Sequence, residues 1–443
     1  MCQDPEIFAR EDTDLKIKIK EHKYADVRDL PMPLHEEPHK QSFLFRLLLR
    51  IASLPDILAT RFSCTRVGME KLGRREPALF LMNHSSFVDL EIASTVLFPR
   101  RFSIVCTHDA MVGKHWLMRQ LGCIPTNKFV SDLRLLHDMH YAAEKQKSSV
   151  LMFPEAGYTL DGRATPLPDN FGKCIKMLGL PVVMITTEGA FARDPLYNNL
   201  QRRRVKVSAE MRYLLSPEEI AEKSAEELGD IIREQFAFDG FRWQQENRVK
   251  ITEDFRADYL HRVLYKCPAC QAEEKMEGKG THITCRACGK SWLLDEYGYL
   301  AAEEGETEFA HIPDWVDWQR ECVRAEILAG EYAPEEEVDI CMLVNSKCLF
   351  RVGEGRLRHD REGFTMDGCE GELHYHQGPL ASHTLNSDFN WYEIGDVIGI
   401  GNRVALYYCF PKRKEVSVFK FRLATEEMYK ITRREKAESA AKA

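Results

Sequence analysis

The strongest constraint on the fold is a series of short β-rich runs between residues 59 and 215 that alternate with segments of helical pattern. In runs such as 150–153 the apolar residues are consecutive, which is typical of strands covered by helices on both faces. The runs occupy residues 78–82, 102–106, 149–153, 181–185 and 205–207. This alternation predicts an α/β domain with a mixed sheet covered by helices.

Composition and charge limit the classes of protein. With 443 residues, 44% of them hydrophobic and 29% charged, the chain can bury two or three domain cores. Its formal net charge of −8 argues against a nucleic-acid binder that works by bulk positive charge, so no nucleic-acid partner is expected. Residues 1–40 are polar and lack the layout of a signal peptide, so we expect a cytoplasmic protein with reduced cysteines.

Residues 43–59 are the longest candidate for a membrane segment. Arg46, Arg50, Pro55 and Asp56 interrupt it, so a spanning helix is not expected. Its apolar residues recur at helical spacing with arginines between them, which predicts an amphipathic helix. Such a helix can lie in a membrane interface or pack on its own domain, and the periodicity does not separate the two.

Changes in composition divide the chain into six parts. Residues 216–265 should be helical, opening at Ser216 with Glu219 completing a capping box. Near the end, several short strands followed by one helix resemble a pleckstrin-homology-like barrel. The predicted parts are a polar N-terminal segment (1–40), the α/β domain with the amphipathic helix at its start (41–265), a cysteine-rich module (266–300), an acidic linker and helix (301–334), a mostly β domain closed by a helix (335–434) and a tail (435–443).

A histidine and an aspartate follow the first β-rich run. Asn83 and His84 come directly after it, and Asp89 lies five residues beyond the histidine. A neutral imidazole can take a proton from a hydroxyl, and a carboxylate on its other ring nitrogen fixes the tautomer and stabilises the imidazolium that forms. A single pair at this spacing arises by chance in many proteins, so the prediction depends on its context.

The context is a second loop that follows another apolar run. After residues 149–153 come Pro154, Glu155 and Gly157, and the proline and glycine punctuate a tight loop suited to close approach of the backbone to a ligand.

Four blocks in one order resemble the 1-acylglycerol-3-phosphate acyltransferase superfamily. They read Asn-His-x-x-x-x-Asp at 83–89, Leu-Gly-Cys-Ile-Pro-Thr-Asn-Lys at 121–128, Phe-Pro-Glu at 153–155 and Gly-Leu-Pro-Val-Val at 179–183. The resemblance implies transfer of a fatty acyl group from acyl-CoA or acyl carrier protein to a hydroxyl of a lysophospholipid or glycerol-phosphate-type acceptor. It makes His84 the general base and Asp89 the residue that orients it.

The acceptor-binding blocks of that superfamily map onto residues 122–128 and 153–159. With Asn83 beside the base, this makes Lys128, Glu155 and Gly157 candidate substrate-binding residues. Lys128 could stabilise an oxyanion or an acceptor phosphate, and it could equally be a solvated surface lysine.

The chain departs from the superfamily where the acceptor phosphate is expected to bind. In place of the usual arginine after Phe-Pro-Glu stands Tyr158, which cannot make a bidentate contact with a phosphate. Arg163, a few residues on, could reach the same anion. Otherwise the acceptor is a lysophospholipid with a different head group or another amphipathic alcohol.

Two Cys-x-x-Cys knuckles form a separate motif. They are Cys267 with Cys270 and Cys285 with Cys288, a spacing that brings four thiolates around a zinc ion. Rubredoxin-like iron and an unrelated cysteine cluster are the alternatives. Four thiolates leave no open position, so we expect structural Zn²⁺ in a module that resembles a zinc ribbon.

Two hypotheses of different classes follow. In the first, the chain is an acyltransferase at the cytosolic face of a membrane, with the ribbon and the C-terminal domain available to a protein partner. In the second, the acyltransferase-like domain is inactive and binds lipid or acyl carrier protein as a scaffold. The presence of both His84 and Asp89 favours the first, since a binding module needs no base-carboxylate pair.

Overall fold

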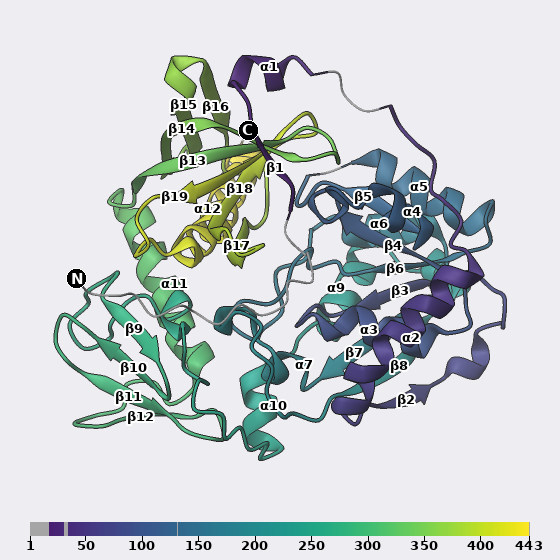
Figure 1. Cartoon of the computed structure of the whole chain (residues 1–443), viewed down its shortest axis with the longest axis horizontal. Helices are drawn as coiled ribbons and strands as arrows, with labels where there is room; N and C mark the ends of the chain where they lie inside the picture. Colours follow the sequence, from purple (N-terminus) through teal and green to yellow (C-terminus); the bar gives the residue numbers. More distant parts are fainter. Residues whose placement is uncertain (1–16, 31–33, 131, 443) are drawn as a thin grey trace, which may run out of the picture.

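The computed structural model describes residues 17–30, 34–130 and 132–442, and these contain three β-sheets. Figure 1 shows a sheet with helices on both sides at the right, a small sheet at the lower left and a third sheet at the upper left. Of the predicted polar segment (1–40), residues 1–16 and 31–33 lie outside the described part. Its described part contains strand β1 (Ile19–Glu21) and helix α1 (Tyr24–Arg28).

The sheet at the right is mixed, as the β-rich runs predict. Its strand order is β2-β8-β7-β3-β6-β4-β5, and neighbours run parallel except β7 and β8. The strands are β2 (Ser63–Val67), β3 (Leu79–Met82), β4 (Phe102–Thr107), β5 (Cys123–Thr126), β6 (Ser149–Met152), β7 (Val182–Glu188) and β8 (Ser208–Leu215).

Two cores lie on the two faces of this sheet. On the central strand β3, Phe80 and Met82 pack into one core while Leu79 and Leu81 pack into the other, because side chains alternate between faces. The first core includes residues of α2 (Phe43–Ala59) and α3 (Val88–Leu97). The second includes residues of α5 (Leu133–Glu144), α6 (Phe171–Leu178) and α9 (Ala225–Gln235). Both faces are therefore covered, which explains the continuous apolar runs.

Local sequence signals agree with the structure at one end of β8 and differ at the other. Ser216 and Glu219 form the predicted capping box of helix α8 (Pro217–Glu222). The predicted strand at 205–207 is wrong, since β8 begins at Ser208. The Val207 amide donates to the Thr60 carbonyl at the end of α2, so this backbone is bonded outside the sheet.

The small sheet is antiparallel and carries the cysteine knuckles. It consists of β9 (Met276–Lys279), β10 (His282–Cys285), β11 (Ser291–Leu294) and β12 (Leu300–Ala302). Trp292 of β11 packs edge-on against Trp315 of α11 (Ile312–Ala329), with ring centroids 5.0 Å apart. Both indoles are fully buried, so α11 and the small sheet share one core.

The third sheet has the order β16-β15-β14-β13-β19-β18-β17, and β1 adds to β14. Its strands are β13 (Glu335–Leu343), β14 (Leu349–Asp360), β15 (Gly363–Gly368), β16 (Leu373–Gln377), β17 (Asn386–Trp391), β18 (Gly395–Gly401) and β19 (Leu406–Pro411). The long helix α12 (Val418–Lys442) follows. The remaining short helices are α4 (His115–Gln120), α7 (Ala190–Arg193) and α10 (Gly240–Glu246), with 3-10 turns at Met69–Lys71, Asp109–Met111, Leu196–Asn198, Leu260–Arg262 and Cys369–Gly371.

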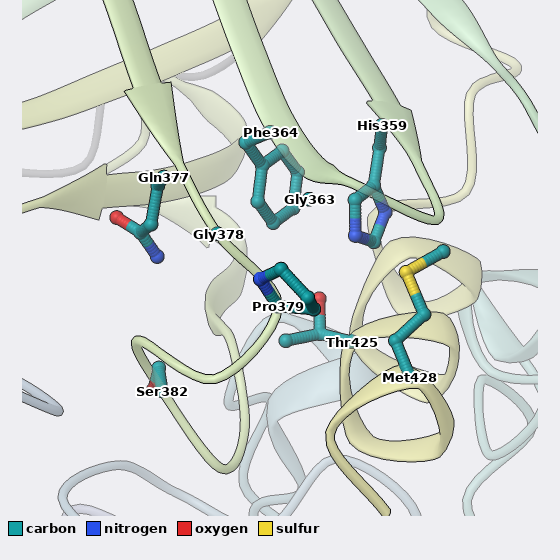
Figure 2. Close-up of a pocket in the computed structure, with 9 residues that line it drawn as sticks. All are labelled: His359, Gly363, Phe364, Gln377, Gly378, Pro379, Ser382, Thr425 and Met428. Atoms are coloured by element: carbon teal, nitrogen blue, oxygen red, sulfur yellow. The ribbon is translucent and has the colours of Figure 1, made fainter. Parts of the chain in front are cut away.

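Figure 2 shows how the third sheet meets α12. His359 and Phe364 face Thr425 and Met428 of the helix, and the two rings stack with centroids 3.8 Å apart. The space left between them is about 10 Å³, at most one water molecule. The sheet and the helix are therefore packed directly against each other.

Candidate active site

The candidate residues gather at one edge of the mixed sheet. The carboxyl ends of β3, β5, β6 and β7 meet there because these strands run parallel. Ligand sites in α/β sheets form at this edge. His84 follows β3, Lys128 follows β5 and Glu155 follows β6, so residues separated in the sequence share one region of the fold.

His84 and Asp89 form the predicted pair. The Nδ1 atom of His84 lies 3.1 Å from Oδ2 of Asp89, which is fully buried in the first turn of α3. The same oxygen accepts from the amides of Ser85 at 2.6 Å and Ser86 at 3.0 Å. Amides at a helix N-terminus favour an ionised carboxylate, which can only accept a hydrogen bond. If Nδ1 donates to this carboxylate, Nε2 is the ring nitrogen that could accept a proton.

Two aromatic rings hold the imidazole of His84. Phe153 stacks on it at a centroid distance of 4.2 Å, and Tyr158 packs against it at 4.4 Å. The His84 side chain is still 21% exposed. Tyr158, the residue in place of the expected arginine, thus contacts the candidate base His84. The sequence showed the substitution but gave no signal of this contact.

Asn83 ties the loop after β3 to strand β7. Its Oδ1 accepts from the amide of Thr187 at 2.7 Å, and its Nδ2 donates to the Thr187 carbonyl at 3.2 Å. Asn83 is fully buried, and this amide joins the loop after β3 to β7. Thr187 also lies within 3.5 Å of Asp89, a contact that sequence reasoning missed because 98 residues separate the two.

Glu155 is also fully buried and holds two loops together. Its Oε1 accepts from the His84 amide at 3.0 Å, and its Oε2 accepts from the Thr165 amide at 2.9 Å. Burial raises the pKa of Glu155 to about 8, although the two amide hydrogen bonds lower it. Both carboxylate oxygens are occupied, so Glu155 anchors the backbone of the base.

The loop that carries Glu155 turns at Ala156, not at Gly157. Ala156 has a φ of 55°, in the left-handed region. A Cβ atom added to Gly157 would meet no atom within 4 Å. The glycine therefore borders open space, which suits the predicted close approach of a ligand.

The structure places the two predicted cations beside carboxylates. Arg163 bonds to Asp161 at 2.9 Å and to Asp317 of α11 at 2.8 Å, so an anionic acceptor would have to displace both partners. Lys128 lies near Asp388 of β17: burial raises the pKa of Asp388 to about 6, and the charge of Lys128 opposes that rise. Arg163 is therefore not an uncompensated phosphate site in this structure.

The four predicted metal ligands come together, Cys285 at the end of β10 and the other three outside the strands of the small sheet. The sulfur atoms of Cys267, Cys270, Cys285 and Cys288 all lie within 4.8 Å of one another. The Sγ atoms of Cys267 and Cys288 are 3.8 Å apart, and those of Cys270 and Cys285 are 3.7 Å apart. The cluster could hold a metal ion.

The site thus brings a partly exposed histidine into contact with a buried aspartate, an arrangement that could remove a proton from a hydroxyl. Residues 64–188, which contain this pair, match the family model described as Acyltransferase. The match makes this segment similar to that family and supports acyltransferase activity in general. The cysteine cluster and the third sheet lie outside it.

Comparison with solved structures found a likeness to the 1-acyl-sn-glycerophosphate (LPA) acyltransferase PlsC from Thermotoga maritima. The sequence identity is 17% and the TM-score is 0.33, over 42% of this chain and 75% of that chain. No curated protein matched the chain.

Proposed function

We propose that this chain transfers a fatty acyl group from acyl-CoA or acyl carrier protein to a hydroxyl of a lysophospholipid or glycerol-phosphate-type acceptor. The observation that carries the proposal is the His84–Asp89 pair at 3.1 Å inside the matched segment. The aspartate is buried and fixed by two amides, while the imidazole is partly exposed.

In the proposed reaction, Nε2 of His84 takes the proton of the acceptor hydroxyl as its oxygen attacks the thioester carbonyl. The C–O bond forms and the C–S bond breaks, and the proton passes from the imidazolium to the departing thiolate. Asp89 accepts from Nδ1 throughout, so it stabilises the imidazolium that forms between these steps.

The acceptor head group in this proposal is one whose recognition does not need an arginine–phosphate pair. Tyr158 replaces the expected arginine, and Arg163 is already paired with two carboxylates. Burial raises the pKa of the Tyr158 hydroxyl, and the nearby charges of Asp89 and Asp388 raise it further. The negative charges of Asp89 and Asp388 near Tyr158 disfavour the binding of a bare phosphate monoester there. We infer a lysophospholipid whose phosphate carries a further head group.

Helix α2 supports peripheral attachment to the cytosolic face of a membrane. No helix in the described ranges is long and apolar enough to span a bilayer. On α2, Arg46 and Ser53 face the domain, and Ser53 bonds to Ser94 of α3 at 2.7 Å. Its apolar side is exposed, with Leu58 at 73% and Ile51 at 52%. An amphipathic helix with its apolar side outward can enter a membrane interface.

The cysteine cluster supports structural Zn²⁺ in a zinc ribbon. A tetrahedron of thiolates at the usual Zn–S distance of about 2.3 Å has edges of about 3.8 Å. Two of the observed sulfur separations are 3.8 and 3.7 Å. The residues present therefore fit zinc, which would supply folding energy to a small module.

The same proposal divides the chain into an acyltransferase domain (41–265), a zinc ribbon (266–300) and a C-terminal β domain (335–434). We propose that this last domain is pleckstrin-homology-like. The antiparallel strands β13 to β19, followed by α12, support it. Either added module could contact a protein partner.

The test is acyl transfer from labelled acyl-CoA, and separately from acyl carrier protein, to a panel of acceptors. The panel should contain lysophosphatidic acid and lysophospholipids with choline, ethanolamine, serine, inositol and glycerol head groups. Turnover with one of the substituted lysophospholipids above lysophosphatidic acid is the expected result. No turnover with any donor and acceptor would favour the lipid-binding or carrier-binding scaffold.

A further inference from the structure

A chain of hydrogen bonds connects the C-terminal helix to the candidate base. Arg422 of α12 donates from Nη2 to Oγ1 of Thr165 at 2.7 Å. The Thr165 amide donates to Glu155 at 2.9 Å, and Glu155 accepts in turn from the His84 amide at 3.0 Å. Arg422, Thr165 and Glu155 are all buried, so water does not compete for these bonds.

Arg422 is itself held in place by buried charge. Glu426, one turn further along α12, lies 3.3 Å from the Arg422 guanidinium and 2.7 Å from Arg320 of α11. Glu426 also accepts from Thr384 at 2.6 Å, from the segment before β17. A buried charge is costly unless it is paired and hydrogen-bonded, so the ion pair with Glu426 restrains the Arg422 side chain in its contact with Thr165.

Other contacts join the same helix and segment to the loop after Glu155. The Nε2 atom of His383 lies 3.1 Å from the carbonyl oxygen of Pro166. The Tyr429 hydroxyl donates to Asp169 at 2.8 Å. In Figure 1, α12 and β17 lie together at the third sheet. The loop between Glu155 and Asp169 is therefore attached to the C-terminal part of the chain at several points.

We propose that Arg422 is a positioning residue of the active site, acting through Thr165 and Glu155 on the backbone of His84. The C-terminal β domain then completes the active site. The expected effect on kcat rests on the proposed function. Arg422 touches no reacting atom, and it lies outside the segment that matches the acyltransferase family.

The expected effect follows from the geometry. If Arg422 no longer holds Thr165, the loop that carries Phe153 and Tyr158 loses a buried attachment, and the imidazole between these rings is less well oriented. A displacement of about 1 Å at a catalytic group can cost about 100-fold in rate. We expect kcat to fall about 10- to 100-fold, with KM for the acyl donor changed less than about 3-fold.

The test uses the full chain with Thr165→Val, Arg422→Met and the double variant. Both single changes remove the same hydrogen bond, so the double variant should lose no more activity than Arg422→Met alone. Arg422→Lys keeps a donor and should recover part of the loss. Arg434→Met is the matched control, because Arg434 lies on the same helix and pairs with Glu438.

A second readout does not need turnover. The rate at which diethyl pyrocarbonate modifies His84, followed by mass spectrometry, should rise several-fold in Thr165→Val and Arg422→Met and stay unchanged in Arg434→Met. A wild-type modification rate and wild-type kcat in Thr165→Val would overturn the proposal. No turnover in the wild type, together with faster modification in the variants, would refute the proposed function and leave Arg422 as the residue that positions His84.

Discussion

Glu155→Gln should remove a pH dependence from the stability of the protein. Burial raises the pKa of Glu155 from 4.5 to about 8 in the folded state. Between these values the folded protein keeps a proton that the unfolded chain releases, so the free energy of unfolding falls as the pH rises. One proton contributes at most about 1.4 kcal/mol per pH unit. From pH about 5.5 to about 7.5 the free energy of unfolding falls by about 2.5 kcal/mol through this group.

The assay is urea unfolding of wild type and Glu155→Gln with zinc present, followed by circular dichroism at several pH values in this range. The glutamine cannot accept from both the His84 and Thr165 amides, so a constant loss of about 1 to 3 kcal/mol is expected as well. The wild-type advantage should shrink as the pH rises. The exposed Glu362→Gln is the control and should keep the wild-type slope. Parallel curves for wild type and Glu155→Gln would refute the reasoning.

Three further predictions concern the pair, the metal and the membrane. Asp89→Asn should lower kcat about 1,000- to 10,000-fold because the amide no longer stabilises an imidazolium; steady-state kinetics would show it, and an unchanged kcat would remove Asp89 from the mechanism. Zinc chelation, or Cys267→Ser, should open the small sheet and shift the emission of the buried Trp292 to longer wavelength; unchanged emission and protease resistance would argue against a structural metal. Ile51→Glu on the exposed side of α2 should weaken binding to anionic phospholipid vesicles at least 10-fold without lowering Tm; equal co-sedimentation with wild type would exclude this face from membrane contact.

The fold of the α/β domain could be predicted in large part because its signals are local. Consecutive apolar runs located β3, β4, β6 and β7 but not β2, β5 and β8, and Ser216 with Glu219 marked a helix start that the structure confirms. Helix α2 spans the predicted residues, Phe43–Ala59. Its orientation could not be predicted, since periodicity defines two sides of a helix without saying which side faces the domain.

The spacing of His84 and Asp89, read together with the blocks around it, predicted their pairing, because a strand-to-helix junction brings them together. The remaining contacts of the site depend on residues far apart in the chain. Arg422 meets Thr165 across 257 residues, and Arg163 meets Asp317 across 154. The sequence near each arginine does not indicate its partner. Tertiary packing alone determines that Arg422 supports the loop and that Arg163 is neutralised.

The measurement that tests the central claim most directly is kcat/KM for acyl transfer, with the donor and acceptor found in the panel, in wild type, His84→Ala and His140→Ala. His140 is an exposed histidine on α5 and serves as the control. If His84 is the general base, its loss should lower kcat/KM at least about 100-fold with an unchanged Tm, while His140→Ala keeps the wild-type value. Equal kcat/KM in all three proteins would contradict the assignment of His84 as the catalytic base.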